Sequence, residues 1–147
     1  MPSPVAHALA GATVALAADL MPGQPPARPL RSGGHARLFA ACAVLAALPD
    51  ADLLLPITHR TVTHSVVAIA AVGLFMIIAA AVTGKVTAKI SLTCVAAYAS
   101  HLLLDWLQTD FTPPHGMQLL WPFSSTWFIS GWNVFRGTER RHFLELA

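Results

Sequence analysis

The feature that most constrains this chain is an apolar run from residue 65 to residue 82 that contains no charged side chain. A helix rises ~1.5 Å per residue, so this run covers ~27 Å, close to the ~30 Å hydrocarbon core of a bilayer. Only 11% of the 147 residues are charged and 55% are hydrophobic, whereas soluble domains carry about a quarter charged residues. We therefore predict an integral membrane protein with one span at residues 64–82.

A second apolar segment follows closely. Residues 86–107 contain Lys89 near their start and His101 and Asp105 near their end, and no other charged residue or histidine. Only residues 83–85 separate this segment from the first span. So short a link makes the two predicted helices an antiparallel hairpin.

Two shorter apolar segments, residues 5–20 and 37–55, precede the hairpin. Residues 21–35 between them are rich in Pro, Gly and Arg, a composition typical of a loop. Each segment is short for a span, but small residues let helices approach closely in lipid. We expect a second hairpin packed on the first, and hence an all-α, integral membrane bundle of about four helices in a single transmembrane domain, residues 1–147.

The chain changes character after residue 107. Residues 109–116 hold two prolines and a glycine and are typical of a turn-rich loop. Residues 116–132 are then rich in Trp and Phe. Because the indole ring is apolar and its N–H needs a partner, tryptophan at this density is typical of the membrane interface. We predict a Trp-rich interfacial segment at residues 116–132.

Composition also excludes several classes of protein. The formal charge of +2 is too small for a nucleic-acid-binding surface. Cys42 and Cys94 lie inside apolar runs, so we expect two buried single thiols and no disulfide framework. No Lys or Arg precedes the first apolar run, and His7 lies within it, which argues against a cleaved signal peptide.

Ionisable groups within or beside membrane spans are costly and usually mark function. In an up-and-down arrangement of four helices, the end of each even helix and the start of each odd helix lie at the same face of the bundle. The informative polar residues all fall at this one face: His7, Asp50, Asp52, His59, Arg60, His64, His101 and Asp105.

Each motif also has a purely structural interpretation. His101 and Asp105 are four residues apart and share a helix face, so they can bind one metal ion or form a hydrogen bond that joins two helices. Asp50 and Asp52 repel each other unless a cation lies between them, but they also suit a solvated turn. His7, near Gly11, can be a ligand or a satisfied core histidine.

The motif THRTVTHS, residues 58–65, contains Arg60 and His64, which are four apart if one helix includes both. Its structural interpretation is a helix start capped by Thr63, with basic residues reaching the interface. Convergence of all these motifs at one end favours a shared site. A mixed shell of His and carboxylate suits zinc above all, or manganese or iron, and the number of candidate ligands leaves room for one or two ions.

Five motifs in this order, HALAG, LPDADLL, HRTVTHS, HLLLD and GMQLLWPF, resemble the YdjM-like family of LexA-binding, inner-membrane-associated, metal-dependent hydrolases. The resemblance covers roughly residues 7–123. It implies a small multi-pass protein of the inner membrane. It also implies a metal site formed by His7, Asp50, Asp52, His64, His101 and Asp105.

The working hypothesis is metal-assisted hydrolysis. A bound ion would activate water, and Asp50 or Asp52 would accept the proton. Arg60 would stabilise developing negative charge, which favours a phosphoester over an amide. A site near the membrane surface suits a lipid or lipid-linked substrate. His59, Thr63 and Ser65 are candidates for additional site residues.

Two other functions stay open. A metal or proton carrier needs polar residues through the whole membrane depth, and the third predicted helix has none at its centre. An interaction protein, with a protein partner and a structural metal, needs a closed ligand shell. The Lys and Arg residues at the face opposite the site outnumber those at the site face, which slightly favours an extracytoplasmic site.

Overall fold

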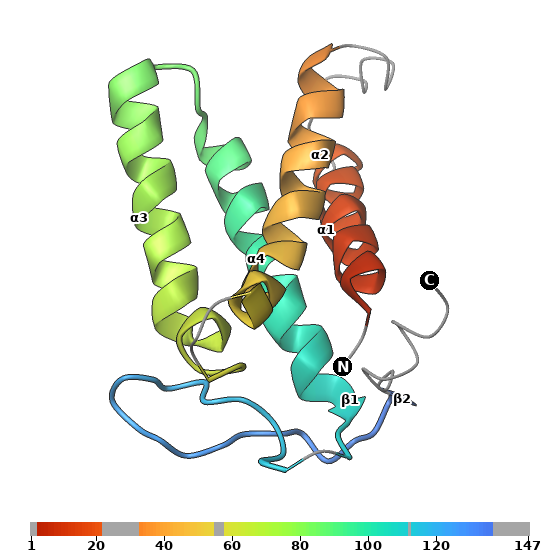
Figure 1. The fold of residues 1–147 in the computed structure, drawn as a ribbon. Coiled ribbons are helices and arrows are strands. Elements are labelled where there is room, and N and C mark those ends of the chain that lie inside the picture. The colour runs from red at the N-terminus through yellow and green to blue at the C-terminus, as the bar shows by residue number, and fades with distance from the viewer. Residues whose placement is uncertain (1–2, 22–32, 55–57, 112, 137–147) are drawn as a thin grey trace.

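The computed structural model describes residues 3–21, 33–54, 58–111 and 113–136. These residues form four α-helices, the number that the sequence predicts (Figure 1). They are α1 (Pro4–Asp19), α2 (Gly33–Ala47), α3 (Val66–Thr83) and α4 (Ala88–Leu107). Two of them, α3 and α4, are long and apolar enough to cross a membrane, with mean hydropathies of 2.7 and 1.4.

Local sequence sets the start of three helices. The side chains of Ser3, Ser65 and Thr87 accept hydrogen bonds from the free backbone N–H groups of the first turns of α1, α3 and α4. Gly84 ends α3 with a φ of 64°, a conformation that glycine adopts without strain. The expectation that Thr63 caps the third helix is wrong, because α3 begins at Val66 and Ser65 is its cap.

The second predicted segment, residues 37–55, is not one α-helix. The α-helix α2 ends at Ala47, and a 3₁₀-helix, η1 (Leu48–Leu54), follows it. Pro49 explains the break, since proline lacks the N–H that continues an α-helix and restricts the residue before it. The tighter turn of η1 buries both Asp50 and Asp52.

Helices α1, α2 and α4 pack against one another, and α3 stands beside α4 (Figure 1). Helices α1 and α2 approach each other closely at Gly11. A Cβ atom at this position would lie 2.2 Å from the carbonyl oxygen of Cys42 and 2.5 Å from the Cβ of Ala46. Cys42 and Cys94 are both buried in the core, and both thiols are free, as expected.

Helix α3 exposes most of its apolar surface. Only 6% of this span is buried within the protein, and side chains such as Phe75 and Ile77 are 67% and 64% exposed. An apolar helix that faces outward all along its length suits contact with lipid tails.

The polypeptide after α4 crosses the end of the bundle at which α1 begins and α4 ends (Figure 1). Its short strand β1 (Gln108–Thr109) pairs in parallel with β2 (Phe135–Arg136). An antiparallel bridge joins Met117 to Phe128, and Met117 is fully buried. The segment predicted to be interfacial, residues 116–132, therefore lies at this end of the bundle.

Candidate metal centre

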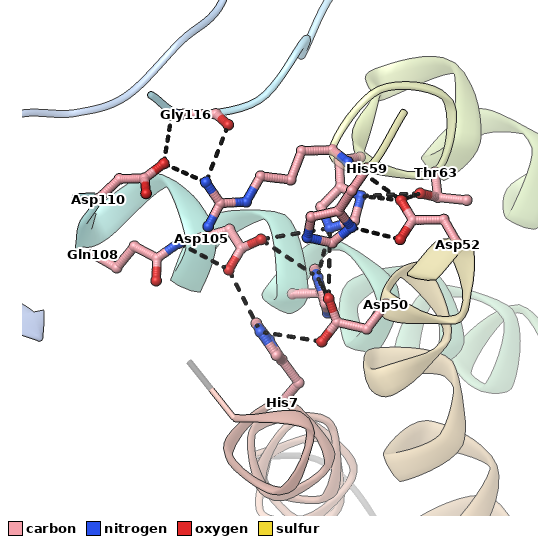
Figure 2. A network of polar contacts seen from close by, with 12 residues as sticks. His7, Asp50, Asp52, His59, Thr63, Asp105, Gln108, Asp110 and Gly116 are labelled. Atoms are coloured by element: carbon pink, nitrogen blue, oxygen red, sulfur yellow. Dashed lines mark hydrogen bonds and ion pairs between the residues drawn. The ribbon is translucent and has the colours of Figure 1, made fainter. Parts of the chain in front are cut away.

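The residues expected to converge on one end of the bundle do so (Figure 2). Helix α1 and the short 3₁₀-helix η2 (Val62–His64) each contribute one of these residues. The 3₁₀-helix η1 contributes two, and the last turns of α4 contribute two. Each is at most 7% exposed, although all of them are ionisable: His7, Asp50, Asp52, His64, His101 and Asp105.

Helix α4 presents His101 and Asp105 on the same face, as their spacing predicts. The Nδ1 atom of His101 lies 2.7 Å from the carbonyl oxygen of Ala46, at the end of α2. A carbonyl only accepts, so Nδ1 carries a proton, and Nε2 is directed into the cluster. Asp105 is held from one side by Gln108, whose Nε2 donates to Oδ1 at 3.3 Å.

His64 is not on a helix with Arg60, contrary to the spacing argument, because Arg60 has a φ of 63° and interrupts any helical path. The hydroxyl of Tyr98 on α4 donates to the carbonyl oxygen of Thr63 at 2.6 Å and attaches η2 to the bundle. This contact directs His64 inward, towards His101. The two Nε2 atoms are 3.1 Å apart.

Asp52 lies behind His64 and does not face the centre of the cluster. Its Oδ2 is 3.4 Å from Nδ1 of His64 and accepts hydrogen bonds from the hydroxyl of Thr63 at 2.8 Å and the backbone N–H of Arg60 at 3.2 Å. Its Oδ1 lies 2.5 Å from Nδ1 of His59. Burial raises the pKa of Asp52, but hydrogen bonds from His59, His64 and Thr63 bring it well below the ordinary value.

Apart from the contact between the two Nε2 atoms, the nitrogen–oxygen pairs at the centre of the cluster are close but longer than ordinary hydrogen bonds. Nε2 of His64 and of His101 lie 3.5 and 3.6 Å from Oδ2 of Asp105, and 3.9 and 3.7 Å from Oδ1 of Asp50. Nε2 of His7 lies 3.5 Å from Oδ1 of Asp105 and 4.0 Å from Oδ2 of Asp50. Protein N–H···O bonds are ~2.7–3.2 Å long.

Several of these atoms lack any partner in the part of the chain that the structure describes. Both ring nitrogens of His7, both oxygens of Asp50 and Oδ2 of Asp105 are buried without a hydrogen bond. An unsatisfied buried polar group costs about 1–3 kcal/mol, and more when it is charged. A bound cation would satisfy the Nε2 lone pairs and carboxylate oxygens together, so the donor set fits a divalent metal ion.

Ligand atoms within 4.8 Å of one another form two sets that share no residue, His7–His101–Asp105 and Asp50–His59–His64. These buried groups could hold a metal ion. A family model described as YdjM inner membrane protein matches residues 1–144, which include every residue of both sets.

The chain belongs to the YdjM family of inner membrane proteins. Membership agrees with the resemblance drawn from the five sequence motifs and supports the inner membrane as the location of this YdjM-family chain. Searches of the curated proteins and of the solved structures each returned no match.

Arg60 was expected to stabilise developing negative charge, but its guanidinium already contacts other residues in this YdjM-family structure. Its guanidinium pairs with Asp110, and NH1 also donates to the carbonyl oxygen of Gly116 at 3.4 Å. Its own carbonyl accepts from the backbone N–H of Gln118 at 2.9 Å. Arg60 therefore attaches the segment before η2 to the polypeptide that crosses the end of the bundle.

Sequence analysis missed Gln108 and Asp110, which lie just beyond α4. Both are polar residues that closely follow a predicted span, and this position in the sequence could have identified them as candidate site residues. Of the additional candidates, Thr63 donates a hydrogen bond to Asp52, whereas Ser65 caps α3 and donates to the carbonyl oxygen of Val62. His59 shares Asp52 with His64.

Proposed function

We propose that this YdjM-family protein is a metal-dependent hydrolase of the inner membrane that acts on a phosphoester or a lipid-linked substrate. One observation carries the proposal. Five buried side chains from four segments direct imidazole nitrogens and carboxylate oxygens at a common centre, with nitrogen–oxygen separations too long for ordinary hydrogen bonds. Such a shell is unfavourable without a cation.

The residues that would hold the metal are His7, Asp50, His64, His101 and Asp105. Nitrogen and carboxylate ligands of this kind suit zinc best, with manganese or iron as alternatives. A bound divalent ion lowers the pKa of a water ligand and so supplies a nucleophile near neutral pH.

Asp50 and Asp52 are the two candidate proton acceptors, and their surroundings favour Asp50. Asp52 already contacts His59, Thr63, Arg60 and His64. Asp50 faces the centre, and neither of its oxygens has a hydrogen-bond partner among the described residues. Asp50 would therefore accept the proton released by the attacking water, while Asp52 holds His64 in position.

Arg60 supports a phosphoester over an amide. Its charge is balanced by Asp110, but its Nε is a buried donor without a partner in the described part of the chain. A phosphate oxygen would satisfy this donor, and a guanidinium matches phosphate geometry. We infer that the substrate's phosphate binds between Arg60 and the metal ligands.

The surface around the site supports a substrate with an apolar part. Leu54, Phe123 and Trp132 are 87%, 87% and 72% exposed at this end of the bundle. Large exposed apolar side chains suit contact with a membrane or an amphiphilic ligand. We propose that all four helices of the single domain cross the bilayer, with the segment 116–132 at the interface.

The test starts with the full chain purified in detergent. Elemental analysis should find zinc, manganese or iron, and a screen of phosphoesters with and without acyl chains should find hydrolysis that a chelator abolishes. The chelated protein reloaded with zinc is the control. Absence of metal after supplementation with all three ions would contradict the proposal.

A second candidate is a non-catalytic interaction protein with a structural metal. It is favoured by the polypeptide that crosses the site end of the bundle, joined to Arg60 through Gln118. This function predicts stoichiometric metal with no hydrolysis of any phosphoester in the screen.

A further inference from the structure

The candidate metal centre is asymmetric about Asp105. Its Oδ2 faces the Nε2 atoms of His64 and His101, and its Oδ1 faces the Nε2 atom of His7. We propose that the cluster holds two divalent ions bridged by Asp105, one bound by His64 and His101 and the other by His7. Asp50 directs one oxygen to each position. This inference rests on the proposed function and deepens it.

The first position is defined by the two facing histidines. His101 donates from Nδ1 to the Ala46 carbonyl, and Nδ1 of His64 lies near Oδ2 of Asp52, a pure acceptor when ionised. With Nδ1 of each ring beside an acceptor, the two Nε2 atoms face each other across 3.1 Å, a hydrogen-bond distance when one of them carries a proton. A metal ion bound by both Nε2 atoms would take the place of that proton and use the lone pair of each ring.

The distances agree with one ion at this position. Four ligands at ~2.0–2.1 Å around a tetrahedral ion lie ~3.3–3.4 Å from one another. The observed edges are 3.1 Å between the two nitrogens and 3.5 and 3.6 Å from these nitrogens to Oδ2 of Asp105. Oδ1 of Asp50, at 3.9 and 3.7 Å, completes the set.

His7 cannot share this ion with His101. The two rings are stacked, with centroids 3.6 Å apart and planes inclined by only 19°. An imidazole lone pair lies in the plane of its ring. An ion in the plane of His101 is therefore displaced from the plane of His7 by about the stacking distance. The His7–His101–Asp105 set thus needs a separate ion for His7, although its ligand atoms are close together.

The second position is set by His7 and the remaining carboxylate oxygens. Nε2 of His7 is 3.5 Å from Oδ1 of Asp105 and 4.0 Å from Oδ2 of Asp50. These three atoms leave coordination positions for water and substrate, whereas His64, His101 and both carboxylates surround the first position. A pair of ions that share a carboxylate suits displacement at phosphorus, where both the attacking and the leaving oxygen need stabilisation.

The experiment uses the full chain in detergent, stripped with a chelator and titrated with Mn²⁺ alone. Bound manganese is measured by elemental analysis and by electron paramagnetic resonance. Wild-type protein should bind two ions per chain and give the spectrum of a spin-coupled pair. His7→Ala should bind one ion and give the spectrum of isolated Mn²⁺. His35→Ala, which removes a histidine outside the cluster, should match the wild type in both measurements.

His59→Ala separates this assignment from its nearest competitor. If it binds one ion while His7→Ala binds two, the second ion lies in the Asp50–His59–His64 set and the proposal is wrong. One ion in the wild type, or two ions without spin coupling, also overturns it, yet leaves the metal-dependent hydrolase intact. No bound ion contradicts the proposed function itself. Because the wild-type result decides between one and two ions, the test does not depend on the folding of a variant.

Discussion

The two ends of the helix bundle contain the same types of residue in opposite situations. At the end away from the metal centre, Asp19 of α1 lies 2.9 Å from Nδ1 of His35 and 3.4 Å from Nζ of Lys89. These side chains are 18%, 26% and 35% exposed. At the metal centre, the corresponding His and Asp side chains are 0–5% exposed and their facing atoms are 3.5–4.0 Å apart.

The difference distinguishes a structural ion pair from a group of residues that could hold a metal ion. The Asp19 group is satisfied by its own neighbours, joins three helices and is partly hydrated, so it needs no ligand. Among the described residues, the buried group has five nitrogen and oxygen atoms of His7, Asp50 and Asp105 without a hydrogen bond, and its side chains are shielded from water. Residue type and helical spacing do not separate these two cases, whereas burial and interatomic distance do.

The largest effect on metal binding is expected when the buried group loses two of its proposed metal ligands. The double variant His101→Ala, Asp105→Ala removes a nitrogen of the first position and the shared carboxylate. We expect metal affinity to fall by more than about 100-fold, since outer partners alone contribute about 10–100-fold. Isothermal titration with zinc measures it. The matched variant His35→Ala, Asp19→Ala should bind as the wild type does, and equal losses in both would end the distinction between the two ends.

A variant of Asp52 tests which residues of the candidate metal centre bind the metal and which only position a ligand. Asp52→Asn keeps the size of the side chain but weakens its hold on His64 and His59. If Asp52 orients His64 and does not itself bind the metal, as we propose, affinity for zinc should fall about 10–100-fold with the number of bound ions unchanged. Co²⁺-loaded protein should keep the absorption bands of the wild type. A lost ion, or bands of a different coordination, would identify Asp52 as a ligand.

Gly11 tests how helix packing supports the site. Gly11→Ala places a methyl group against the carbonyl oxygen of Cys42, so α1 must move away from α2, and His7 lies one turn earlier on α1. Overpacking of this kind destabilises by about 1–3 kcal/mol. We expect a lower melting temperature in detergent and weaker metal binding.

The matched control for Gly11→Ala is Gly73→Ala on α3, where the new methyl group would lie 3.8 Å from Val95, an ordinary contact. Gly73→Ala should leave metal binding unchanged and should not lower the melting temperature, because alanine favours a helix over glycine. If both variants behave alike, the close approach at Gly11 is not what positions His7.

The smallest effect is expected at the opposite end. Lys89→Ala removes a partly exposed partner of Asp19. Exposed ion pairs contribute about 0–1 kcal/mol, so the melting temperature should change little and metal affinity not at all. A large loss of metal binding in Lys89→Ala would show that the two ends are coupled through α4.

The sequence predicts more of the site than of its surroundings. His101 and Asp105 share a face because helical geometry is local, and alternation of four helices is enough to bring His7 and the residues around Asp50 to the same end. Asp52 and Arg60 could not be interpreted in this way. Their positions depend on η1, on the positive φ of Arg60 and on contacts with Asp110 and Gln118, which are 50 and more residues from Arg60 along the chain.

By itself, the sequence determined the membrane character, the four helices and the end of the bundle at which the polar residues gather. These properties follow from hydropathy and helical periodicity, which act over one or two turns. Only the tertiary structure decided that Asp50 faces the centre, that Asp52 supports His64 from behind and that His7 stacks on His101. Such relations depend on how irregular segments and helix ends pack across the bundle, at distances where a displacement of 1 Å separates a ligand from a neighbour.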